Sequence, residues 1–389
     1  MNSSKDEAPS LPRMHGRAAT HGRPASCRRQ REEREACDQP AVLRSLPFTR
    51  VYVTPEARDF PAAQRGLARL GFLPVFSARS HEDIPPEHRS GETLFITTPR
   101  GETLGLCPGS RGHVCCNYLT VDLYMGCTLG CSYCIMKSYL NFEPVTVYAD
   151  PSPPLRRIRE IAVAHKDRLI RVGSGETGDS LQLDPVFELS AEFIEGLADL
   201  PNVMFEAKTK TASVEQLLAI PRKGNAVIAF SLNARRVSQA EETAAASLDE
   251  RLCAARRAVE SGYLTAFHFD PIIAFTGWED AYAEVIALLA GFPAEKVAWI
   301  SLGTFRYPPA LKDRIGQRPY LFDEFVPCRD GKFRYIQRRR GRVYAWFLER
   351  LRKTCDAPVY LCMESATVWQ KVYGTGPVKN PRTRELFLR

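Results

Sequence analysis

The residues with the clearest chemical potential are three cysteines in the segment MGCTLGCSYCIMKSYL. Cys127, Cys131 and Cys134 follow the spacing C-x3-C-x2-C. Three thiolates in one tight loop can bind three irons of a cubane iron–sulfur cluster. Two other interpretations stay open, because the thiols could be unliganded or could bind zinc with a fourth ligand from elsewhere. The candidates for that fourth ligand are His113, Cys115 and Cys116.

A cubane held by three cysteines leaves its fourth iron without a protein ligand. That iron can chelate the amino and carboxylate groups of S-adenosylmethionine, and one electron from the cluster then releases a 5′-deoxyadenosyl radical. Tyr133, just before the last cysteine, is suited to packing against the adenine. Because the x3-x2 spacing is unusual for zinc, we favour a 4Fe-4S cluster with S-adenosylmethionine as cofactors.

Alternating strand and helix patterns would position this loop. Apolar runs typical of strands alternate with segments in which apolar residues recur every three or four positions, as in helices. The runs cover residues 118–124, 169–172, 203–205, 226–231, 264–269 and 297–302. These units predict a parallel α/β architecture. In a barrel, functional side chains lie at the carboxyl ends of the strands, and the cysteines follow the first run.

Length and composition exclude several classes of protein. The chain has 389 residues, of which 44% are hydrophobic and 25% charged, the mixture of an ordinary globular protein. No window approaches the roughly 20 apolar residues of a membrane span, and the polar start has no apolar core of a secretory signal. We therefore expect a soluble, cytoplasmic protein without a membrane partner, in which clustered cysteines bind metal rather than form disulfides.

Shifts in composition divide the chain into four parts. We expect a disordered basic tail, a small N-terminal α/β cap, the barrel, and a C-terminal hairpin and helix region that contacts DNA, at residues 1–45, 46–112, 113–320 and 321–389. Asp330 and Gly331 lie between alternating flanks, which predicts a β-hairpin. Residues 329–353 carry ten basic and two acidic side chains, an excess of +8 that equals the net charge of the whole chain.

The order of short motifs from Thr93 to Trp369 resembles the spore photoproduct lyase family. The matching pieces include CTLGCSYC, GSGETGDSLQLD, EAKTK, FSLNARRV, HFDPII, SLGTFRY, DGKFRY and LCMES. The resemblance implies a partial (β/α)6 TIM-like barrel of the radical S-adenosylmethionine type. It also implies that groups at successive strand ends bind S-adenosylmethionine. The residues at matching positions are Gly173, Gly175, Glu176, Asp179, Lys208, Ser231, Asn233 and Asp270. Taken singly, such residues are more often turn glycines or capping groups.

The same resemblance implies that the hairpin at residues 326–337 enters damaged DNA. Its basic side chains would bind phosphates, Tyr335 with Phe333 would prop the gap left by an extruded dinucleotide, and Arg306 would line the entrance. The phosphate-binding set is Lys332, Arg334, Arg338, Arg339 and Arg340. A solvated basic hairpin without a ligand is the alternative.

The reaction that the resemblance implies starts from a methylene-bridged thymine dimer, the spore photoproduct, in DNA. The 5′-deoxyadenosyl radical would abstract a hydrogen atom from C6 of the dimer, the bridging C–C bond would break, and return of a hydrogen atom would give two thymines. A one-electron reductant such as flavodoxin or ferredoxin would supply the electron.

Two positions depart from the family pattern. Glu176 stands where the family has a hydrogen-donating cysteine, and Ile135 stands where it has a tyrosine after the last cluster cysteine. A carboxylate cannot donate a hydrogen atom as a thiol does, so either another donor serves or the substrate differs. The donor candidates are Cys115, Cys116 and Tyr133. The alternative functions are a related radical enzyme acting on another nucleic acid or nucleotide, and a non-catalytic iron–sulfur protein that binds DNA or senses redox state.

Overall fold

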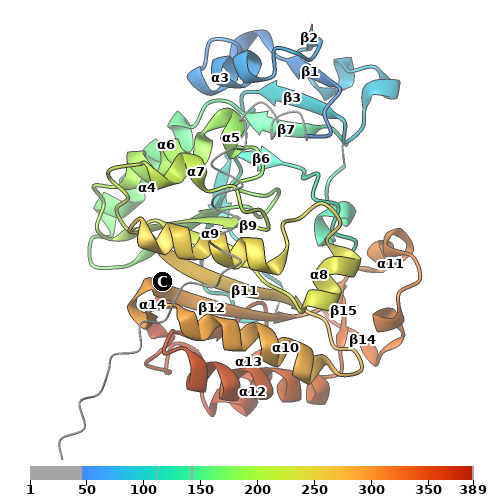
Figure 1. Cartoon of the computed structure of the whole chain (residues 1–389), viewed down its shortest axis with the longest axis vertical. Coiled ribbons are helices and arrows are strands. Elements are labelled where there is room, and N and C mark those ends of the chain that lie inside the picture. Colours follow the sequence, from blue (N-terminus) through green and yellow to red (C-terminus); the bar gives the residue numbers. More distant parts are fainter. Residues whose placement is uncertain (1–45, 111, 142, 388–389) are drawn as a thin grey trace, which may run out of the picture. The chain divides into compact units, whose positions relative to one another are not determined.

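The large sheet forms the centre of the structure, a computed structural model that describes residues 46–110, 112–141 and 143–387 (Figure 1). Its strands, from one edge to the other, are β16 (Val359–Leu361), β12 (Val297–Thr304), β11 (Leu264–Ile272), β10 (Val227–Ser231), β9 (Val203–Thr209), β8 (Ile170–Ser174), β5 (Leu119–Val121) and β4 (Leu104–Leu106). Every neighbouring pair from β16 to β5 is parallel, and β4 is antiparallel to β5. The predicted partial barrel is confirmed, with β16 as an additional parallel strand. The tail predicted for residues 1–45 lies outside the described residues.

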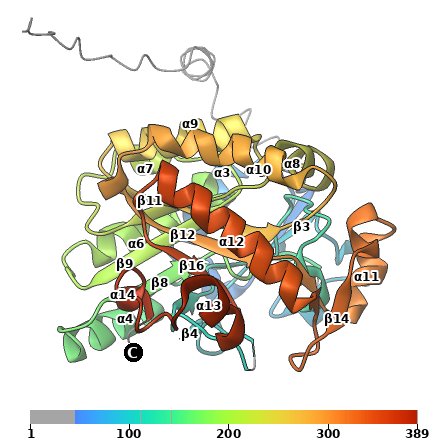
Figure 2. The same cartoon turned by 90° about the horizontal axis from the view of Figure 1, so that it is seen from below.

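Helices pack around this sheet and beside the rest of the described chain. The helices are α3 (Pro61–Arg69), α4 (Ser152–Ala164), α5 (Asp184–Phe187), α6 (Leu189–Leu197), α7 (Glu215–Leu218), α8 (Arg235–Glu241), α9 (Leu248–Glu260), α10 (Trp278–Ala287), α11 (Pro309–Ile315), α12 (Gln337–Thr354), α13 (Ala366–Tyr373) and α14 (Arg384–Phe387). The sequence sets the start of α9 by a capping box, in which Ser247 and Glu250 each bond the other's backbone N–H. Helix α12 packs against β12 and β16, and Figure 2 shows it crossing the sheet.

A second sheet carries the N-terminal part of the described chain. Its order is β2 (Val75–Ser77), β1 (Arg50–Val53), β3 (Thr93–Thr97), β7 (Val145–Tyr148) and β6 (Tyr124–Met125). Strands β6 and β7 come from beyond residue 112, and β4 of the large sheet comes from before it. Each sheet therefore contains strands from both sides of the predicted boundary at residue 112, and the four-part division stays a prediction.

The predicted hairpin is present in the third sheet. Strand β15 (Phe333–Tyr335) pairs antiparallel with β14 (Phe325–Pro327) on one side and β13 (Arg306–Tyr307) on the other. Gly331 adopts a φ of 76° in the turn, which favours glycine. Since β13 follows β12 directly, this sheet is tied to the carboxyl ends of the barrel strands.

Among the described residues, no helix is both long and apolar enough to cross a membrane.

Candidate active site

The three cysteines lie in one loop, residues 126–134, which we call the cluster loop. It runs between β6 and the short 3-10 helix η4 (Ile135–Ser138). Gly126 has a φ of 89° and donates its N–H to the carbonyl of Thr177 at 3.0 Å. Within the loop, the N–H of Leu129 donates to Cys127 Sγ at 3.5 Å and that of Cys134 to the Cys131 carbonyl at 3.3 Å. The loop is therefore a folded turn.

Groups in the loop after β8 and at the end of α8 fix the cluster loop to the barrel. The N–H of Thr128 donates to Gln182 Oε1 at 3.2 Å, and that of Ser132 to the carbonyl of Glu241 at 2.8 Å. The hydroxyl of Tyr133 donates to Glu242, which also pairs with Arg251. Tyr133 is buried in the core rather than open to a ligand, so its contribution in this structure is to hold the loop. Its predicted roles in adenine packing and hydrogen donation stay predictions.

The donor set of the cluster loop fits an iron–sulfur cluster. Three thiols are the soft ligands that iron–sulfur clusters require. Burial raises the pKa of Cys131 to about 11, although Lys210 opposes it, and burial also raises the pKa of Cys127. The thiols of Cys127 and Cys131 are thus protonated before metal binds, and cluster insertion must release those two protons. In the described residues no three His, Cys, Asp or Glu side chains converge on one metal ion. A cubane cluster does not require such convergence, because each cysteine binds a different iron.

Glycines at the end of β8 allow close packing. A Cβ atom on Gly173 would lie 1.4 Å from the hydroxyl of Tyr118, and one on Gly175 would lie 2.7 Å from the carbonyl of Lys208. Gly175 also has a φ of 89°. These two positions therefore require glycine, and the backbone after β8 can pass close to its neighbours at the end of the barrel where the cluster loop is attached.

Charged groups gather at this end of the barrel, which we call the mouth. Lys208 Nζ lies 3.4 Å from a carboxylate oxygen of Glu176, and both side chains are about three-quarters buried. Burial alone would lower the pKa of Lys208, but Glu176, Glu206 and Asp270 raise it above its ordinary value. Asp270 accepts two hydrogen bonds from Arg306, at 3.0 and 3.2 Å. The structure thus brings the predicted groups Glu176, Lys208 and Asp270 together.

Two other predicted cofactor ligands already have full sets of partners. Asp179 is buried, and its carboxylate accepts four hydrogen bonds of 2.7 to 3.0 Å, three of them from backbone N–H groups. Asn233 accepts from the hydroxyl of Tyr282 at 2.5 Å and donates to the carbonyl of Pro271 at 3.1 Å. Ser231 is buried at the end of β10 beside Asn233. The contacts of Asp179 and Asn233 position the strand ends, and the ligand roles of these residues stay predictions.

A buried polar layer below the mouth had not been singled out from the sequence. Glu206 accepts from the Tyr118 hydroxyl at 2.6 Å, lies 2.6 Å from His268 Nε2 and accepts from Trp299 Nε1 at 3.3 Å. Burial alone would raise the pKa of Glu206, but His268 and Arg171 together lower it to about 2. The layer supports Gly173 from below, since the same Tyr118 hydroxyl is the first atom that a Cβ there would meet.

The structure places the predicted DNA-binding side chains in two settings. Tyr335 and Arg340 are 0% and 5% exposed, and Arg334 is 1% exposed. Lys332 is buried too, and Arg306 is held by Asp270 at the mouth. Arg338 is exposed, and Arg339 pairs with Asp323 at 2.6 Å. Most of the predicted set therefore contacts protein groups in this structure, and its role in binding DNA stays a prediction.

The predicted thiol donors Cys115 and Cys116 lie before β5, whereas Cys362, which the sequence pattern did not single out as a donor, lies at the mouth. Cys115 and Cys116 are hydrogen-bonded to each other, and Cys115 is also hydrogen-bonded to Cys107. The bond to Cys107 and burial raise the pKa of Cys115, although the bond to Cys116 opposes this, and the bond to Cys115 and burial raise the pKa of Cys116. Cys362 follows β16, and its N–H donates to the carbonyl of Leu302 at 2.8 Å. Its thiol lies within electrostatic reach of Asp270, Arg306 and Glu176. Cys362 is therefore a thiol at the mouth itself.

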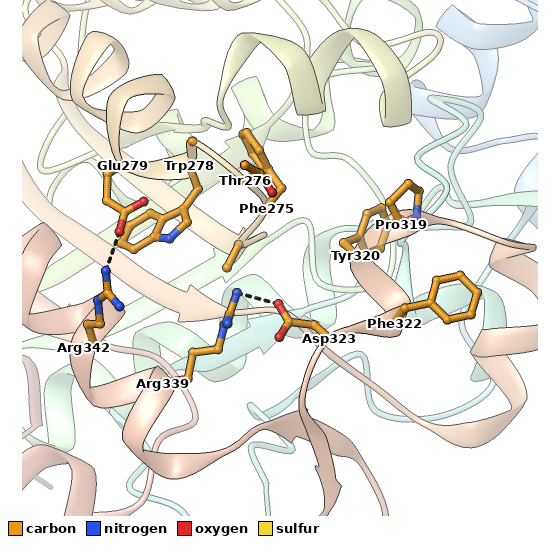
Figure 3. A pocket seen from close by; sticks show the side chains of 12 residues that line it. Phe275, Thr276, Trp278, Glu279, Pro319, Tyr320, Phe322, Asp323, Arg339 and Arg342 are labelled. Atoms are coloured by element: carbon orange, nitrogen blue, oxygen red, sulfur yellow. Dashed lines mark hydrogen bonds and ion pairs between the residues drawn. The ribbon is translucent and has the colours of Figure 1, made fainter.

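A separate cavity of about 490 Å³ lies beside α10 (Figure 3). Aromatic side chains including Phe275, Trp278 and Phe322 line it, and Phe322 is 74% exposed. The two arginines in its wall are paired with carboxylates from the same wall, Arg339 with Asp323 and Arg342 with Glu279. None of the groups at the mouth lines this cavity.

Comparison with known proteins gives one consistent result. Residues 113–318 match the protein-family model described as spore photoproduct lyase. A spore photoproduct lyase of Geobacillus sp. (strain Y412MC61) is 29% identical over 256 residues, covering 62% of this chain and 72% of that protein. One from Clostridium acetobutylicum is 23% identical over 196 residues, covering 50% and 58%.

Solved structures of spore photoproduct lyase share the fold. One is complexed with dinucleoside spore photoproduct, with a TM-score of 0.70 and 21% identity. Another is a mutant with bound AdoMet and dinucleoside spore photoproduct, with a TM-score of 0.70 and 22% identity. Each comparison covers 81% of this chain and 98% of the solved chain.

Proposed function

The chain belongs to the spore photoproduct lyase family, and we propose that it is a radical S-adenosylmethionine lyase that repairs DNA by converting spore photoproduct to two thymines. The observation that carries the proposal is the cluster loop, which gathers three thiols in one turn and is bonded through Gly126 to Thr177, the residue after Glu176, whose carboxylate pairs with Lys208. When bound by Cys127, Cys131 and Cys134, a 4Fe-4S cluster supplies the electron that cleaves S-adenosylmethionine to a 5′-deoxyadenosyl radical.

The residues of the mouth would bind and orient the methionyl part of S-adenosylmethionine. The carboxylate of Glu176 can receive the ammonium group, and Lys208 can pair with the methionyl carboxylate. In this structure the two side chains neutralise each other at 3.4 Å. A zwitterion can exchange into that pair without leaving a buried charge alone, which would otherwise be costly.

Cys362 is the thiol best placed to return a hydrogen atom to the product. Once the bridging bond has broken, one thymine carries a carbon radical at its methyl position. Transfer of a hydrogen atom from the S–H bond of Cys362 would form the missing C–H bond and leave a thiyl radical. One electron from the reductant and one proton from solvent would restore the thiol. Burial raises the pKa of Cys362 well above its ordinary value, which keeps the thiol in the S–H form that this step needs.

The other thiols fit this role less well. Cys355 is buried in the core against α12, and Cys328 lies in the hairpin, where its thiol faces the carbonyl of Val326. Cys115 and Cys116 bond to each other within the segment before β5. In the described residues, Cys362 is the cysteine outside the cluster loop whose electrostatic neighbours include both Glu176 and Asp270. Cys362 therefore offers a thiol from the other side of the barrel that could replace the family's donor cysteine, whose position Glu176 occupies.

The experiment that tests the function uses the full-length protein, reconstituted without oxygen, with a one-electron reductant such as flavodoxin or ferredoxin. S-adenosylmethionine and an oligonucleotide carrying spore photoproduct are added, and 5′-deoxyadenosine and restored thymine are measured together. Both should increase with substrate. 5′-Deoxyadenosine without thymine would discard this substrate and retain a radical enzyme. Neither product from a fully loaded cluster would refute the enzymatic proposal.

A second candidate follows from Glu176, which replaces the family's donor cysteine with a carboxylate. A related radical enzyme acting on a different nucleic acid or nucleotide would not need a thiol at that position. The two candidates differ in how 5′-deoxyadenosine release responds to damaged and undamaged oligonucleotides. A spore photoproduct lyase should be stimulated only by the damaged oligonucleotide. An enzyme for another substrate should show equal release with both.

A further inference from the structure

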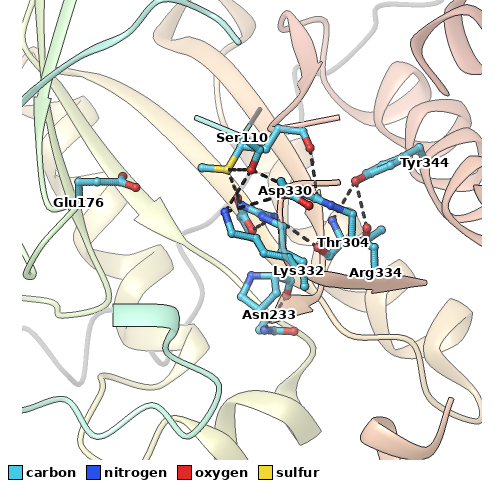
Figure 4. Close-up of polar contacts among 12 residues, drawn as sticks. Ser110, Glu176, Asn233, Thr304, Asp330, Lys332, Arg334 and Tyr344 are labelled. Carbon is cyan, nitrogen blue, oxygen red and sulfur yellow. Dashed lines mark hydrogen bonds and ion pairs between the residues drawn. The ribbon is translucent and has the colours of Figure 1, made fainter. Parts of the chain in front are cut away.

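The hairpin turn places an aspartate in an unusual position. Asp330 lies in the turn between β14 and β15, where such a residue is ordinarily solvated. Here its side chain is only 3% exposed and folds back toward the mouth. One carboxylate oxygen accepts from Arg334 Nη2 at 2.6 Å and lies 4.0 Å from Lys332 Nζ (Figure 4). The turn thus buries a negative charge between two positive ones.

The cations around Asp330 also share a neutral partner. Lys332 Nζ donates to the hydroxyl of Ser110 at 3.1 Å, and Arg334 Nη2 donates to the same oxygen at 3.2 Å. Arg334 is further held by the carbonyl of Met363 at 3.3 Å. Two cations therefore converge on one carboxylate and one hydroxyl, which leaves one positive charge in excess.

This arrangement leaves hydrogen-bonding capacity unused. Arg334 Nε is buried and has no hydrogen-bond partner among the described residues. Buried polar atoms are normally paired, and an unpaired one costs free energy. A carboxylate offers two oxygens in a plane, whereas a phosphate offers oxygens at tetrahedral corners. A phosphate group could therefore accept from Ser110, Lys332 and more than one nitrogen of Arg334 together.

An exposed aromatic ring lies beside these groups. Tyr139 follows η4 of the cluster loop region and is 48% exposed. It lies within electrostatic reach of Asp330, Arg334 and Arg306. A base can stack on an exposed tyrosine while its phosphate pairs with neighbouring cations, which is the usual combination in proteins that bind single-stranded nucleic acid.

We propose that Ser110, Lys332 and Arg334 form a phosphate-binding subsite for one phosphodiester of the DNA strand, and that Asp330 fills this subsite until DNA displaces it. The proposal rests on the proposed function, because it names where the damaged strand is held relative to the mouth. Asp330 lies in a turn, so its side chain can rotate away from the two cations. The other buried carboxylate paired with an arginine of this segment, Glu364, could not do so, because its backbone forms a bridge with Val114 after β16. Tyr139 would stack on a base next to that phosphodiester.

The test is the affinity of the full-length protein for a fluorescent oligonucleotide over a range of salt concentrations, without S-adenosylmethionine. Asp330→Asn keeps the size of the side chain and removes the competing charge, so it should bind about two- to fivefold more tightly than the wild type. Asp323→Asn is the matched control, because it removes one charge from the same region but pairs with Arg339 outside the subsite. Lys332→Met should reduce the salt slope for duplex DNA by about 0.9, the value for one phosphate contact.

A dinucleotide and the matching pair of nucleosides provide a direct probe of the phosphodiester. Asp330→Asn should increase affinity for the dinucleotide and leave that for the nucleosides unchanged. Equal affinities of the Asp330 and Asp323 variants, or an unchanged salt slope in Lys332→Met, would overturn the subsite. These binding measurements need no turnover. If they contradict the subsite while thymine release is normal, the proposed function stays intact. If they support the subsite while no thymine is released, the subsite is retained and the proposed function fails.

Discussion

Replacing Arg340 by methionine should destabilise the fold strongly, although its position in a basic segment suggests a DNA contact. Arg340 donates to Glu364 through Nε at 2.9 Å and Nη2 at 3.3 Å, and also to the carbonyl of Tyr335. Glu364 is 0% exposed, and after the substitution it would keep the N–H of Ser365 at 2.7 Å as a donor. Breaking one side of a buried ion pair costs about 3–5 kcal/mol. Since one hydrogen bond to Glu364 remains, we expect a loss near the lower end, about 3 kcal/mol.

The assay is urea unfolding followed by circular dichroism, with the loss read from the shift of the midpoint at constant slope. Arg338→Met is the matched control, because Arg338 belongs to the same run of arginines but is exposed, and it should change stability by less than about 0.5 kcal/mol. Adding Glu364→Gln to Arg340→Met should recover part of the loss, with a coupling energy of at least about 1 kcal/mol. A stability of Arg340→Met equal to that of Arg338→Met, together with weaker DNA binding, would refute the reasoning and restore Arg340 as a phosphate ligand.

Three further predictions concern the cofactor, the thiol and pH. Alanine at any one cluster cysteine should abolish iron loading, measured as the visible absorbance of the reconstituted protein, and retained absorbance would refute the ligand set Cys127, Cys131 and Cys134. Cys362→Ala should still release 5′-deoxyadenosine but form at least about tenfold less thymine, since hydrogen return typically relies on one positioned group. In the apoprotein, bound photoproduct should protect the Cys362 thiol from alkylation. A normal thymine yield from Cys362→Ala would exclude Cys362 as the donor. Because the pKa of Glu206 is lowered to about 2 from 4.5, its contribution to stability is full above pH 4.5 and is lost as pH falls toward 2. Glu206→Gln should therefore lose less stability than the wild type between pH 5 and pH 3, and parallel pH profiles would contradict this.

The sequence predicted most strands of the barrel because they are mainly apolar runs, although the run at 118–124 is divided between β5 in the large sheet and β6 in the N-terminal sheet. The run at 297–302 lies within β12 (Val297–Thr304), and that at 226–231 coincides with β10 to within one residue. Strand β16 was not expected, because Val359–Leu361 is only three residues long and its pairing with β12 depends on a partner some 60 residues away. Short apolar runs have no period from which strand and helix can be told apart.

The candidate site was predicted only where residue type alone carries the chemistry. The spacing of Cys127, Cys131 and Cys134 needs no tertiary information, and neither do glycines at a strand end. Burial is a tertiary property, which is why Tyr335 could be expected to enter DNA although it packs in the core, where it accepts from the N–H of Ala274 at 3.1 Å. The Cys362 thiol could not be assigned for the same reason, because its neighbours at the mouth come from three other strands.

The attachments of the cluster loop have a consequence for the biogenesis of the protein. The loop begins at β6, which pairs with β7 in the N-terminal sheet, and it is bonded to Thr177 in the turn after β8 and to Glu241 at the end of α8. Its shape therefore depends on segments more than 100 residues apart, and a nascent chain released only as far as Cys134 has no means of adopting it. If these thiols bind the proposed cluster, its insertion would follow folding of the chain. A cell that loads this protein with iron would be selecting correctly folded copies, and the colour of the purified protein would report the fraction of chains in which both sheets have formed.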